Sequence, residues 1–348
     1  MMTRKFMIVC LVLTFCGVIL AACGDSSSSS QAEGSDKIKL KVADSFPTTN
    51  LLSSEGIVYF MDRVEELTNN KVEFEYFPAE QIGKAGDFLN LIQSGTIDIG
   101  YTSYATDKLP LTEVPTLPGA YSTSQEGTKI FWKLMEGMLI EEEYKPNNLR
   151  PLWAVPIPQY QIATKDKKVD SLEDVKDLKM RATGTMEFSL DELGASPTFM
   201  AAPEAYTALE RGTVDGVVFP FTSFKPYQMQ EIIEYSTGNA RLGSFNVVYS
   251  IDQKVYQELP NDVKKAIQKA GQETMDHLSK LLDEKNKELR KEFSSQMEIV
   301  MLEEAELKKW DKALEPVWDR WAEDLESRGI PANKAIEKYN KFKEEISE

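Results

Sequence analysis

The chain has 348 residues, with 40 basic and 56 acidic side chains and a formal net charge of −16 at pH 7. This acidic balance excludes ordinary binding to nucleic acid, whose phosphates require basic residues. His277 is the only histidine, and no glycine-rich phosphate-binding motif occurs, so histidine-based catalysis and His-rich metal sites are excluded. We therefore expect no enzyme activity, no cofactor and no metal. A hydrolase that uses a pair of carboxylates is the enzyme class that this reasoning leaves open.

The first residues are typical of a lipoprotein leader. Arg4 and Lys5 precede an uncharged apolar run at 6–20, which has the length of the apolar part of a signal peptide and is short for a membrane-spanning helix. The run ends at Leu20-Ala21-Ala22-Cys23, which resembles a lipobox. The resemblance implies that residues 1–22 are a signal peptide, that Cys23 is acylated, and that the protein is anchored to the outer side of the cell membrane.

Residues 23–36 are rich in serine and glycine and too polar to bury, so we expect a lipid-anchored flexible tether before a fold that starts near Lys37. Cys23 would be the single cysteine of the mature chain, which excludes disulfides and thiolate metal sites. Loss of the two basic leader residues leaves 38 basic against 56 acidic side chains, a net charge of −18. Such a field repels an anionic solute, so binding one requires a local, desolvated cation, and this singles out buried arginines.

A β-α-β unit opens the predicted fold. Apolar side chains alternate with lysines at 38–42, which predicts a strand with one covered face. Apolar residues at helical spacing predict a helix over 57–67, and a second alternating strand follows at 72–76. Such a crossover predicts a largely parallel, doubly wound sheet, whose ligands bind at the carboxyl ends of the strands.

One internal sequence repeat favours two lobes, because the sequence of residues 91–98 recurs loosely at 208–215. Each copy predicts a helix that stops at a glycine and then turns into a short apolar strand, at 97–101 in one case and at 214–219 in the other. We infer two related halves with a cleft between them. Two unrelated helix ends in one continuous sheet are the alternative.

The second half of the chain is mostly helical. A capping-box pattern at 171–174 predicts a helix start, and the strand that follows at 179–182 contains Arg181. The charged segment 263–297 keeps its apolar residues on one face, which predicts a long helix or two in series. A further helix over 307–325 carries aromatic residues that we assign to the core, and a last helix starts at Pro331.

Several strings resemble, in order and spacing, the substrate-binding subunits of TRAP transporters, the DctP-like family. They lie at 81–83, 95–98, 178–181, 193–198, 203–209 and 212–218. The resemblance implies an α/β, two-lobed fold like that of periplasmic binding proteins, with a ligand cleft between the lobes and a long helix that spans both. It places lobe I at 37–158 plus 245–285, and lobe II at 159–244 plus 286–348.

The same resemblance implies an extracytoplasmic receptor that closes on its solute about a hinge. Such a receptor delivers the solute to a separate membrane permease of two subunits, which is powered by an ion gradient. A surface lipoprotein that binds protein partners through an exposed apolar patch is the alternative from another class.

In the family, an arginine at the position of Arg181 pairs with the carboxylate of the solute. A guanidinium suits this role because it offers two parallel N–H donors and stays protonated when desolvated, whereas lysine lacks the fork. The alternative for Arg181 is a surface ion pair with one of the many acidic residues. We therefore predict a receptor for a small organic carboxylate.

Three departures from the family pattern concern the rest of the site. Many members carry a second polar anchor, commonly arginine, near the position of Gln161, asparagine at the position of Phe219, and a further polar residue near Phe245. Without the second cation a C4-dicarboxylate is less favoured, and phenyl rings in the cleft favour a solute with an apolar or aromatic body. A C4-dicarboxylate, and phenylalanines that only pack inside a lobe, remain the alternatives.

Other candidates for the cleft lie near the carboxyl ends of strands or in the loops that follow them: Asp44, Phe46, Ser103, Tyr104, Tyr160 and Tyr206. Asp215 lies beside Gly216 in a connection from helix to strand. We interpret Asp215 as a turn or capping residue.

Overall fold

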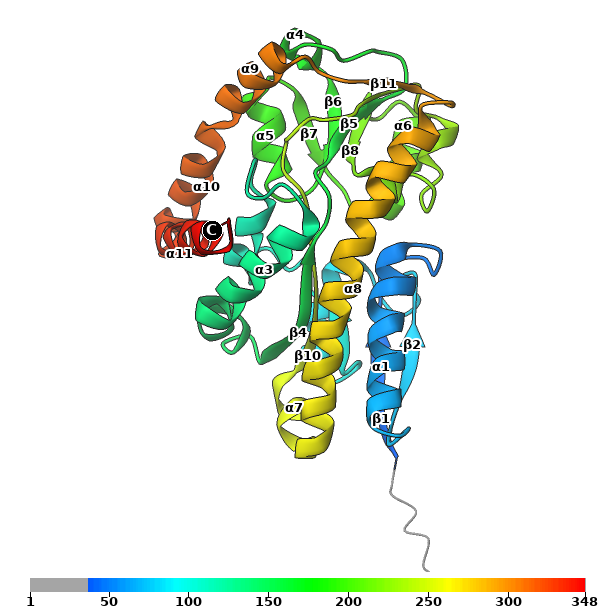
Figure 1. Cartoon of the computed structure of the whole chain (residues 1–348), viewed down its shortest axis with the longest axis vertical. Coiled ribbons are helices and arrows are strands. Elements are labelled where there is room, and N and C mark those ends of the chain that lie inside the picture. Colours follow the sequence, from blue (N-terminus) through cyan, green and yellow to red (C-terminus); the bar gives the residue numbers. More distant parts are fainter. Residues whose placement is uncertain (1–36, 348) are drawn as a thin grey trace, which may run out of the picture. The chain divides into compact units, whose positions relative to one another are not determined.

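A computed structural model describes residues 37–347, which form two β-sheets flanked by helices (Figure 1). The predicted signal peptide, the tether and Cys23 lie outside the described residues. The first sheet has the strand order β2-β1-β3-β10-β4, with β1 at Ile38–Ala43, β2 at Val72–Phe77, β3 at Ile99–Tyr101, β4 at Leu149–Pro156 and β10 at Asn246–Asp252. The second has the order β11-β9-β5-β8-β6-β7, with β5 at Gln161–Thr164, β6 at Lys179–Ala182, β7 at Ser196–Phe199, β8 at Gly216–Phe219, β9 at Tyr235–Thr237 and β11 at Glu298–Val300.

Helices cover both sheets. The α-helices are α1 Tyr59–Leu67, α2 Phe88–Gln93, α3 Ser124–Leu134, α4 Leu172–Val175, α5 Met186–Glu192, α6 Ala205–Glu210, α7 Gln253–Glu258, α8 Asn261–Phe293, α9 Glu304–Leu314, α10 Pro316–Ser327 and α11 Ala332–Ser347. Two π-helical segments, η1 Leu52–Val58 and η4 Met135–Tyr144, and five 3-10 segments, η2 Ala85–Asp87, η3 Pro110–Thr116, η5 Ala202–Glu204, η6 Phe221–Ser223 and η7 Met229–Glu231, join them. Within residues 37–347, no helix has both the length and the apolar character that crossing a membrane requires.

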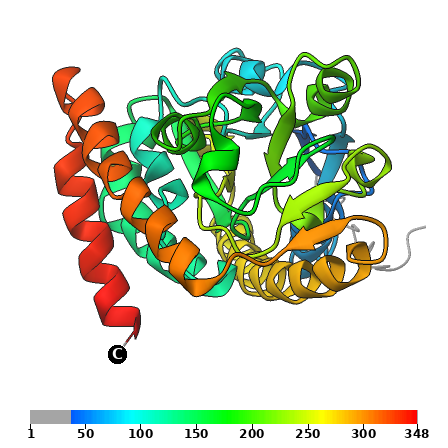
Figure 2. The ribbon, with the colours of Figure 1, turned by 90° about the horizontal axis from the view of Figure 1, so that it is seen from above.

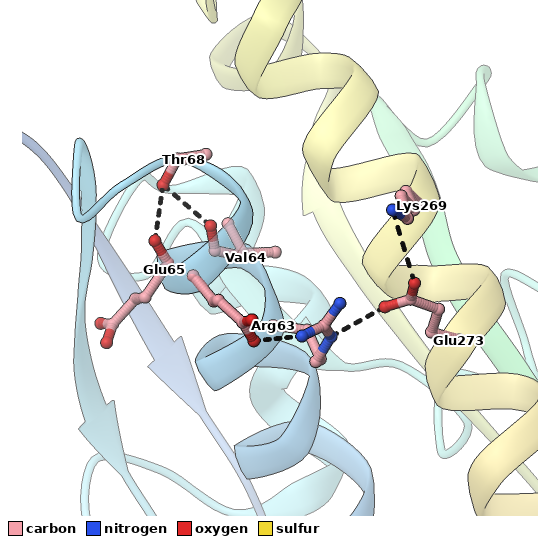
Figure 3. Close-up of polar contacts among 7 residues, drawn as sticks. Arg63, Val64, Glu65, Thr68, Lys269 and Glu273 are labelled. Atoms are coloured by element: carbon pink, nitrogen blue, oxygen red, sulfur yellow. Dashed lines mark hydrogen bonds and ion pairs between the residues drawn. The ribbon is translucent and has the colours of Figure 1, made fainter.

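The predicted β-α-β opening is confirmed. Strand β1 pairs in parallel with β2, and α1 lies between them in the chain. Helix α1 ends where the Thr68 hydroxyl donates to the carbonyl oxygen of Val64 at 2.8 Å, and Arg63 of α1 donates through Nε to Glu273 of α8 at 2.8 Å (Figure 3). The ion pair therefore ties the first crossover helix to the long helix.

The two copies of the internal sequence repeat have the same local structure in the two sheets. Gly95 and Gly212 both have positive φ angles, of 72° and 68°, which lets the chain leave α2 and α6 and turn into β3 and β8. The aspartates that follow occupy matching places, because Asp98 Oδ2 accepts from the N–H of Lys41 at 2.7 Å and Asp215 Oδ2 accepts from the N–H of Lys179 at 2.8 Å. Each aspartate thus fixes the start of one strand against its parallel neighbour, as expected of a turn residue.

Helix α8 is a single helix of 33 residues that contacts elements of both lobes. It packs against α1, α3 and β4 beside the first sheet (Figure 1), and against η6 beside the second sheet. Gly271 allows the closest approach, because a β-carbon there would lie 2.3 Å from the carbonyl oxygen of Leu152. Phe293 at the other end lies 5.3 Å from Phe224 between ring centroids. The predicted helix that spans both lobes is confirmed.

Two details of the prediction were wrong. Each sheet is mixed rather than largely parallel, because β10 runs antiparallel to β3 and β4, and β5 runs antiparallel to β8 and β9. The single helix expected over 307–325 is two helices, α9 and α10, since Pro316 lacks an N–H and its ring clashes with the preceding turn. Of the aromatic residues of these helices, Trp310 and Trp321 lie in the core, each 1% exposed, and Trp318 is partly buried against it.

The C-terminal helices do not all contact the same elements. Helices α9 and α10 pack against α5, whereas α11 packs against α3 and η3 (Figure 2). The division into 37–158 plus 245–285 and 159–244 plus 286–348 stays a prediction.

Candidate functional site

Arg181 is a fully buried cation in the second sheet. It lies in β6, between β7 and β8, with 1% of its surface exposed. Its Nε donates to the carbonyl oxygen of Met200 at 3.0 Å, and its Nη1 donates to that of Val218 at 3.2 Å. These two bonds fix the guanidinium and use two of its five N–H groups, so others can donate to a further acceptor.

No acidic side chain of residues 37–347 forms an ion pair with Arg181. The arginines that do form ion pairs in this part of the chain all have side chains that are partly or half exposed at the surface. The charge of Arg181 lowers the pKa of Glu187, but burial of that carboxyl is the larger effect and the net shift is upward. A desolvated cation with only neutral partners is costly. An anion that entered beside Arg181 would remove that cost.

Phe219 covers one face of the guanidinium. The Arg181 Cζ lies 4.4 Å from the centroid of the Phe219 ring, a cation–π contact that holds the fork in place. Phe219 is itself stacked on Tyr227, with centroids 5.8 Å apart and planes at 18°, and lies 6.2 Å from Tyr160. An aromatic wall therefore surrounds the cation on the side of the second sheet.

A second aromatic wall comes from the first sheet. Tyr104, which follows β3, lies 5.2 Å from Phe245 and 5.6 Å from Tyr101 between ring centroids. Phe46, which follows β1, lies 4.9 Å from Tyr101. Burial raises the pKa of the Tyr104 phenol, and the charge of Arg181 opposes this shift, which places Tyr104 close to the cation. Phe199 of β7 lies 6.5 Å from Tyr104 between ring centroids, so a residue of the second sheet reaches this wall.

A cavity of about 350 Å³ opens between the two lobes next to these walls. Ser45 and Glu80, from the loops after β1 and β2, line it together with Tyr206 of α6 and Tyr227 of the loop after η6. The structure therefore brings Tyr206 to the space between the lobes.

Asp44 is buried and serves the first lobe. Its Oδ1 accepts from the N–H of Phe46 at 2.9 Å and from the Tyr249 hydroxyl at 2.7 Å, and its Oδ2 accepts from the Tyr76 hydroxyl at 2.7 Å. Burial raises the pKa of Asp44 to about 6, although these hydrogen bonds act in the opposite direction. Asp44 thus fixes the loop that carries Phe46.

Gln161 and Ser103 also use their polar atoms inside the protein. The Gln161 amide donates to the carbonyl oxygen of Ala240 at 3.1 Å and accepts from the Thr237 hydroxyl and the Ala240 N–H, each at 3.0 Å. The Ser103 hydroxyl accepts from the N–H of Val248 at 2.9 Å. These bonds tie strands and loops together close to the aromatic walls.

Three members of the walls are absent from the sequence-based prediction: Tyr101, Tyr227 and Phe199. Tyr101 and Phe199 end strands β3 and β7, so the rule that sites form at the carboxyl ends of strands could have found them. Tyr227 follows an irregular loop, and no pattern in the sequence points to it.

The chain resembles known proteins over most of its length. A family model described as bacterial extracellular solute-binding protein, family 7, the DctP family, matches residues 45–324. The chain belongs to this family. A C4-dicarboxylate-binding periplasmic protein, DctP, from Rhodobacter capsulatus is 27% identical over 81% of this chain and 86% of its own.

Two solved structures share the fold. A TRAP solute-binding protein from Rhodoferax ferrireducens, in complex with copurified benzoate, superimposes with a TM-score of 0.83 at 23% identity, over 89% of this chain and 99% of that one. A TRAP solute-binding protein from a marine metagenome, specific for aromatic acid ligands and in complex with 3-hydroxybenzoate, gives a TM-score of 0.82 at 20% identity, over 90% and 99%. The predicted periplasmic-binding-protein fold and the family are confirmed, and the chain is an extracytoplasmic solute-binding protein rather than an enzyme.

Proposed function

We propose that this protein is a TRAP-type receptor for a monocarboxylate with an aromatic or apolar body. The proposal rests on the observation that the guanidinium of Arg181 is buried and fixed by hydrogen bonds, and has no acidic partner among the described residues. A carboxylate beside it would accept two charge-assisted hydrogen bonds and neutralise the buried charge. Closure of the lobes would then complete the desolvation of the pair.

The count of buried cations favours one carboxylate over two. Arg181 is the only lysine or arginine among the buried residues of 37–347. A C4-dicarboxylate would bring its second charge into a space lined by the aromatic rings around Phe219 and Tyr104, with no second cation to compensate its desolvation. The dicarboxylate alternative is supported by the relative from Rhodobacter capsulatus, whose name states that it binds such a solute.

Aromatic side chains on both walls favour an apolar or aromatic solute body. Phe219, Tyr160 and Tyr227 on one side and Tyr104 and Phe245 on the other present ring surface around the cation. Ring surfaces bind an aromatic body by apolar burial and by stacked or edge-on contacts. The two solved structures with aromatic acids bound support this class of solute.

The remaining predicted site residues have graded support. Phe46 and Tyr206 lie at the aromatic wall and the cavity, so we keep them as lining residues. Asp44, Ser103 and Gln161 are hydrogen-bonded within the protein, and their role would be to position the lining residues.

A thermal-shift screen tests the proposal. Purified protein is melted with benzoate, phenylacetate, pyruvate, succinate and gluconate, because a solute at about a hundred times its Kd stabilises the fold by about 2.7 kcal/mol. We expect the aromatic acids to raise the melting temperature of the wild type and of the Arg241→Met variant but not of Arg181→Met. Arg241 is a matched control, since its side chain is 51% exposed and pairs with Asp311 at 3.4 Å. A shift with succinate alone would favour the dicarboxylate, and no shift with any acid would favour the protein-binding lipoprotein.

The partners and the anchor complete the proposal. A TRAP permease of two membrane subunits would receive the solute, and acylated Cys23 would hold the receptor at the membrane. Expression of the Cys23→Ala variant should move the protein from the membrane fraction to the soluble fraction. A variant that stays in the membrane fraction, with the leader removed, would contradict the lipid anchor.

A further inference from the structure

Two buried phenol hydroxyls beside the site form no hydrogen bond of normal geometry with the described residues. They belong to Tyr101, which is 0% exposed, and to Tyr227, which is 9% exposed. Buried polar groups are normally paired, because an unpaired one loses its hydrogen bonds to water without replacement. The lack of a hydrogen-bond partner for each of these hydroxyls therefore needs an explanation.

Other buried tyrosines of the same protein are satisfied. The Tyr249 hydroxyl donates to Asp44 at 2.7 Å, and the Tyr339 hydroxyl donates to the carbonyl oxygen of Ala120 at 3.4 Å. The Tyr144 hydroxyl accepts from the Thr112 hydroxyl at 3.1 Å. The unpaired state is therefore a feature of two tyrosines at the aromatic walls rather than of buried tyrosines in general.

The two tyrosines approach the site from opposite lobes. Tyr101 ends β3 and lies against Tyr104 and Phe245, at 5.6 and 6.4 Å between centroids. Tyr227 stacks on Phe219, which itself covers Arg181, and lines the cavity between the lobes. One unpaired hydroxyl thus belongs to the aromatic wall beside each sheet, and the wall beside the second sheet holds Arg181.

We infer that Tyr101 and Tyr227 select solutes that carry a second oxygen, a hydroxyl or a carbonyl group, on the body beyond the carboxylate. The inference rests on the proposed function and narrows its solute class to hydroxy- or oxo-substituted aromatic acids. A phenol can donate to either oxygen and can also accept from a solute hydroxyl. An acid without the second oxygen leaves both tyrosine hydroxyls unpaired once the lobes close, and sites of this kind discriminate strongly against the analogue that lacks the group.

Calorimetric titration of purified protein with matched pairs of acids tests the inference. The pairs are benzoate with 3-hydroxybenzoate, benzoate with 4-hydroxybenzoate, and phenylacetate with mandelate, each differing by one hydroxyl. We expect at least one hydroxy acid to bind about tenfold more tightly than its parent, in line with the gain from pairing a buried polar group. In the double variant Tyr101→Phe/Tyr227→Phe this preference should fall to about twofold, while the parent acid keeps its affinity.

The Tyr339→Phe variant is the matched control, because it removes a buried tyrosine hydroxyl that is already paired and lies far from Arg181 in the chain. It should keep the full preference for the hydroxy acid. The double variant should melt at or above the wild-type temperature, because its lost hydroxyls form no hydrogen bond of normal geometry within residues 37–347. This readout separates folding from selectivity.

The outcomes are distinct. Equal binding of every parent and hydroxy acid to the wild type, or a preference that survives in the double variant, overturns the inference and leaves the proposed aromatic monocarboxylate in place. Failure of every aromatic acid to bind the wild type overturns the proposed function and this inference with it.

Discussion

Replacing Arg181 with lysine and with methionine separates the geometry of the guanidinium from its charge. A hydrogen bond to a charged group contributes about 1.5–3 kcal/mol. Lysine keeps a charge but can offer one well-placed bond instead of the fork, so Arg181→Lys should weaken carboxylate binding by about 1.5–3 kcal/mol, or roughly 10- to 150-fold. Methionine removes both bonds, and Arg181→Met should weaken binding by about 3–6 kcal/mol, which is roughly a hundredfold or more.

Isothermal titration with the best acid from the screen measures these losses. Lysine and methionine at Arg241 are the matched controls, because that guanidinium is half-exposed and its ion pair with Asp311 is 3.4 Å long. Both control variants should keep Kd within about twofold, as expected of an exposed pair. A folded Arg181→Met variant that binds the acid with nearly wild-type affinity would refute the pairing of Arg181 with the carboxylate.

Two further predictions concern stability. Burial, followed by the charges of Glu143 and Glu187, raises the pKa of Glu113 from 4.5 to about 8. The folded state therefore binds this proton more tightly than the unfolded state does. The resulting contribution to the stability of the fold is fully present below about pH 4.5 and is lost as the pH rises to about 8. The melting temperature of the wild type should therefore fall more steeply between pH 5 and pH 8 than that of Glu113→Gln, and parallel pH profiles would contradict the assignment. Gly271→Ala should lower the free energy of unfolding in urea by about 1–3 kcal/mol, because its β-carbon would meet the carbonyl oxygen of Leu152 at 2.3 Å. Gly86→Ala, where a β-carbon meets nothing within 4 Å, is the control and should change that free energy by about 0.5 kcal/mol or less.

The fold was largely predictable because its signals are local. Alternation at 38–42 and 72–76 gives strands β1 and β2, and the one-sided apolar pattern beyond residue 261 gives α8. The repeated helix stop at Gly95 and Gly212 predicts the relation between the lobes, since a positive φ angle is needed there in both.

The errors in the fold come from effects that a local pattern does not contain. Strand β10 pairs with a strand far away in the chain, Tyr249 with Tyr101, so no short pattern encodes its antiparallel direction. The interruption between α9 and α10 is encoded by Pro316, but the apolar spacing continues across it from 307 to 325 and by itself predicts one helix.

The site was predictable only at its centre. The acidic charge of the chain called for a buried arginine, and the resemblance to the TRAP family placed it at Arg181; its burial, with no acidic partner within residues 37–347, supports that choice. The sequence does not show which hydrogen bonds a polar side chain forms. Gln161 lies at the position expected for a second anchor of the solute, but its amide forms hydrogen bonds with Thr237 and Ala240. The contact of Gln161 with the solute stays a prediction. Tyr227 could be identified only from the folded structure of its loop.

The acidity of the chain and the capture of an anion are compatible because they act over different distances. At physiological ionic strength the field of surface carboxylates is screened over about 8 Å, so most of the −16 charge acts on the approach of the solute rather than on the bound state. Arg181 acts inside, where the carbonyl oxygens of Met200 and Val218 and the ring of Phe219 replace water. There the cation meets a carboxylate at contact distance in a weakly polarisable surrounding, and a single arginine outweighs the distant charges. One buried arginine is therefore enough to define the class of solute, and the aromatic walls and the tyrosine hydroxyls are left to choose among its members.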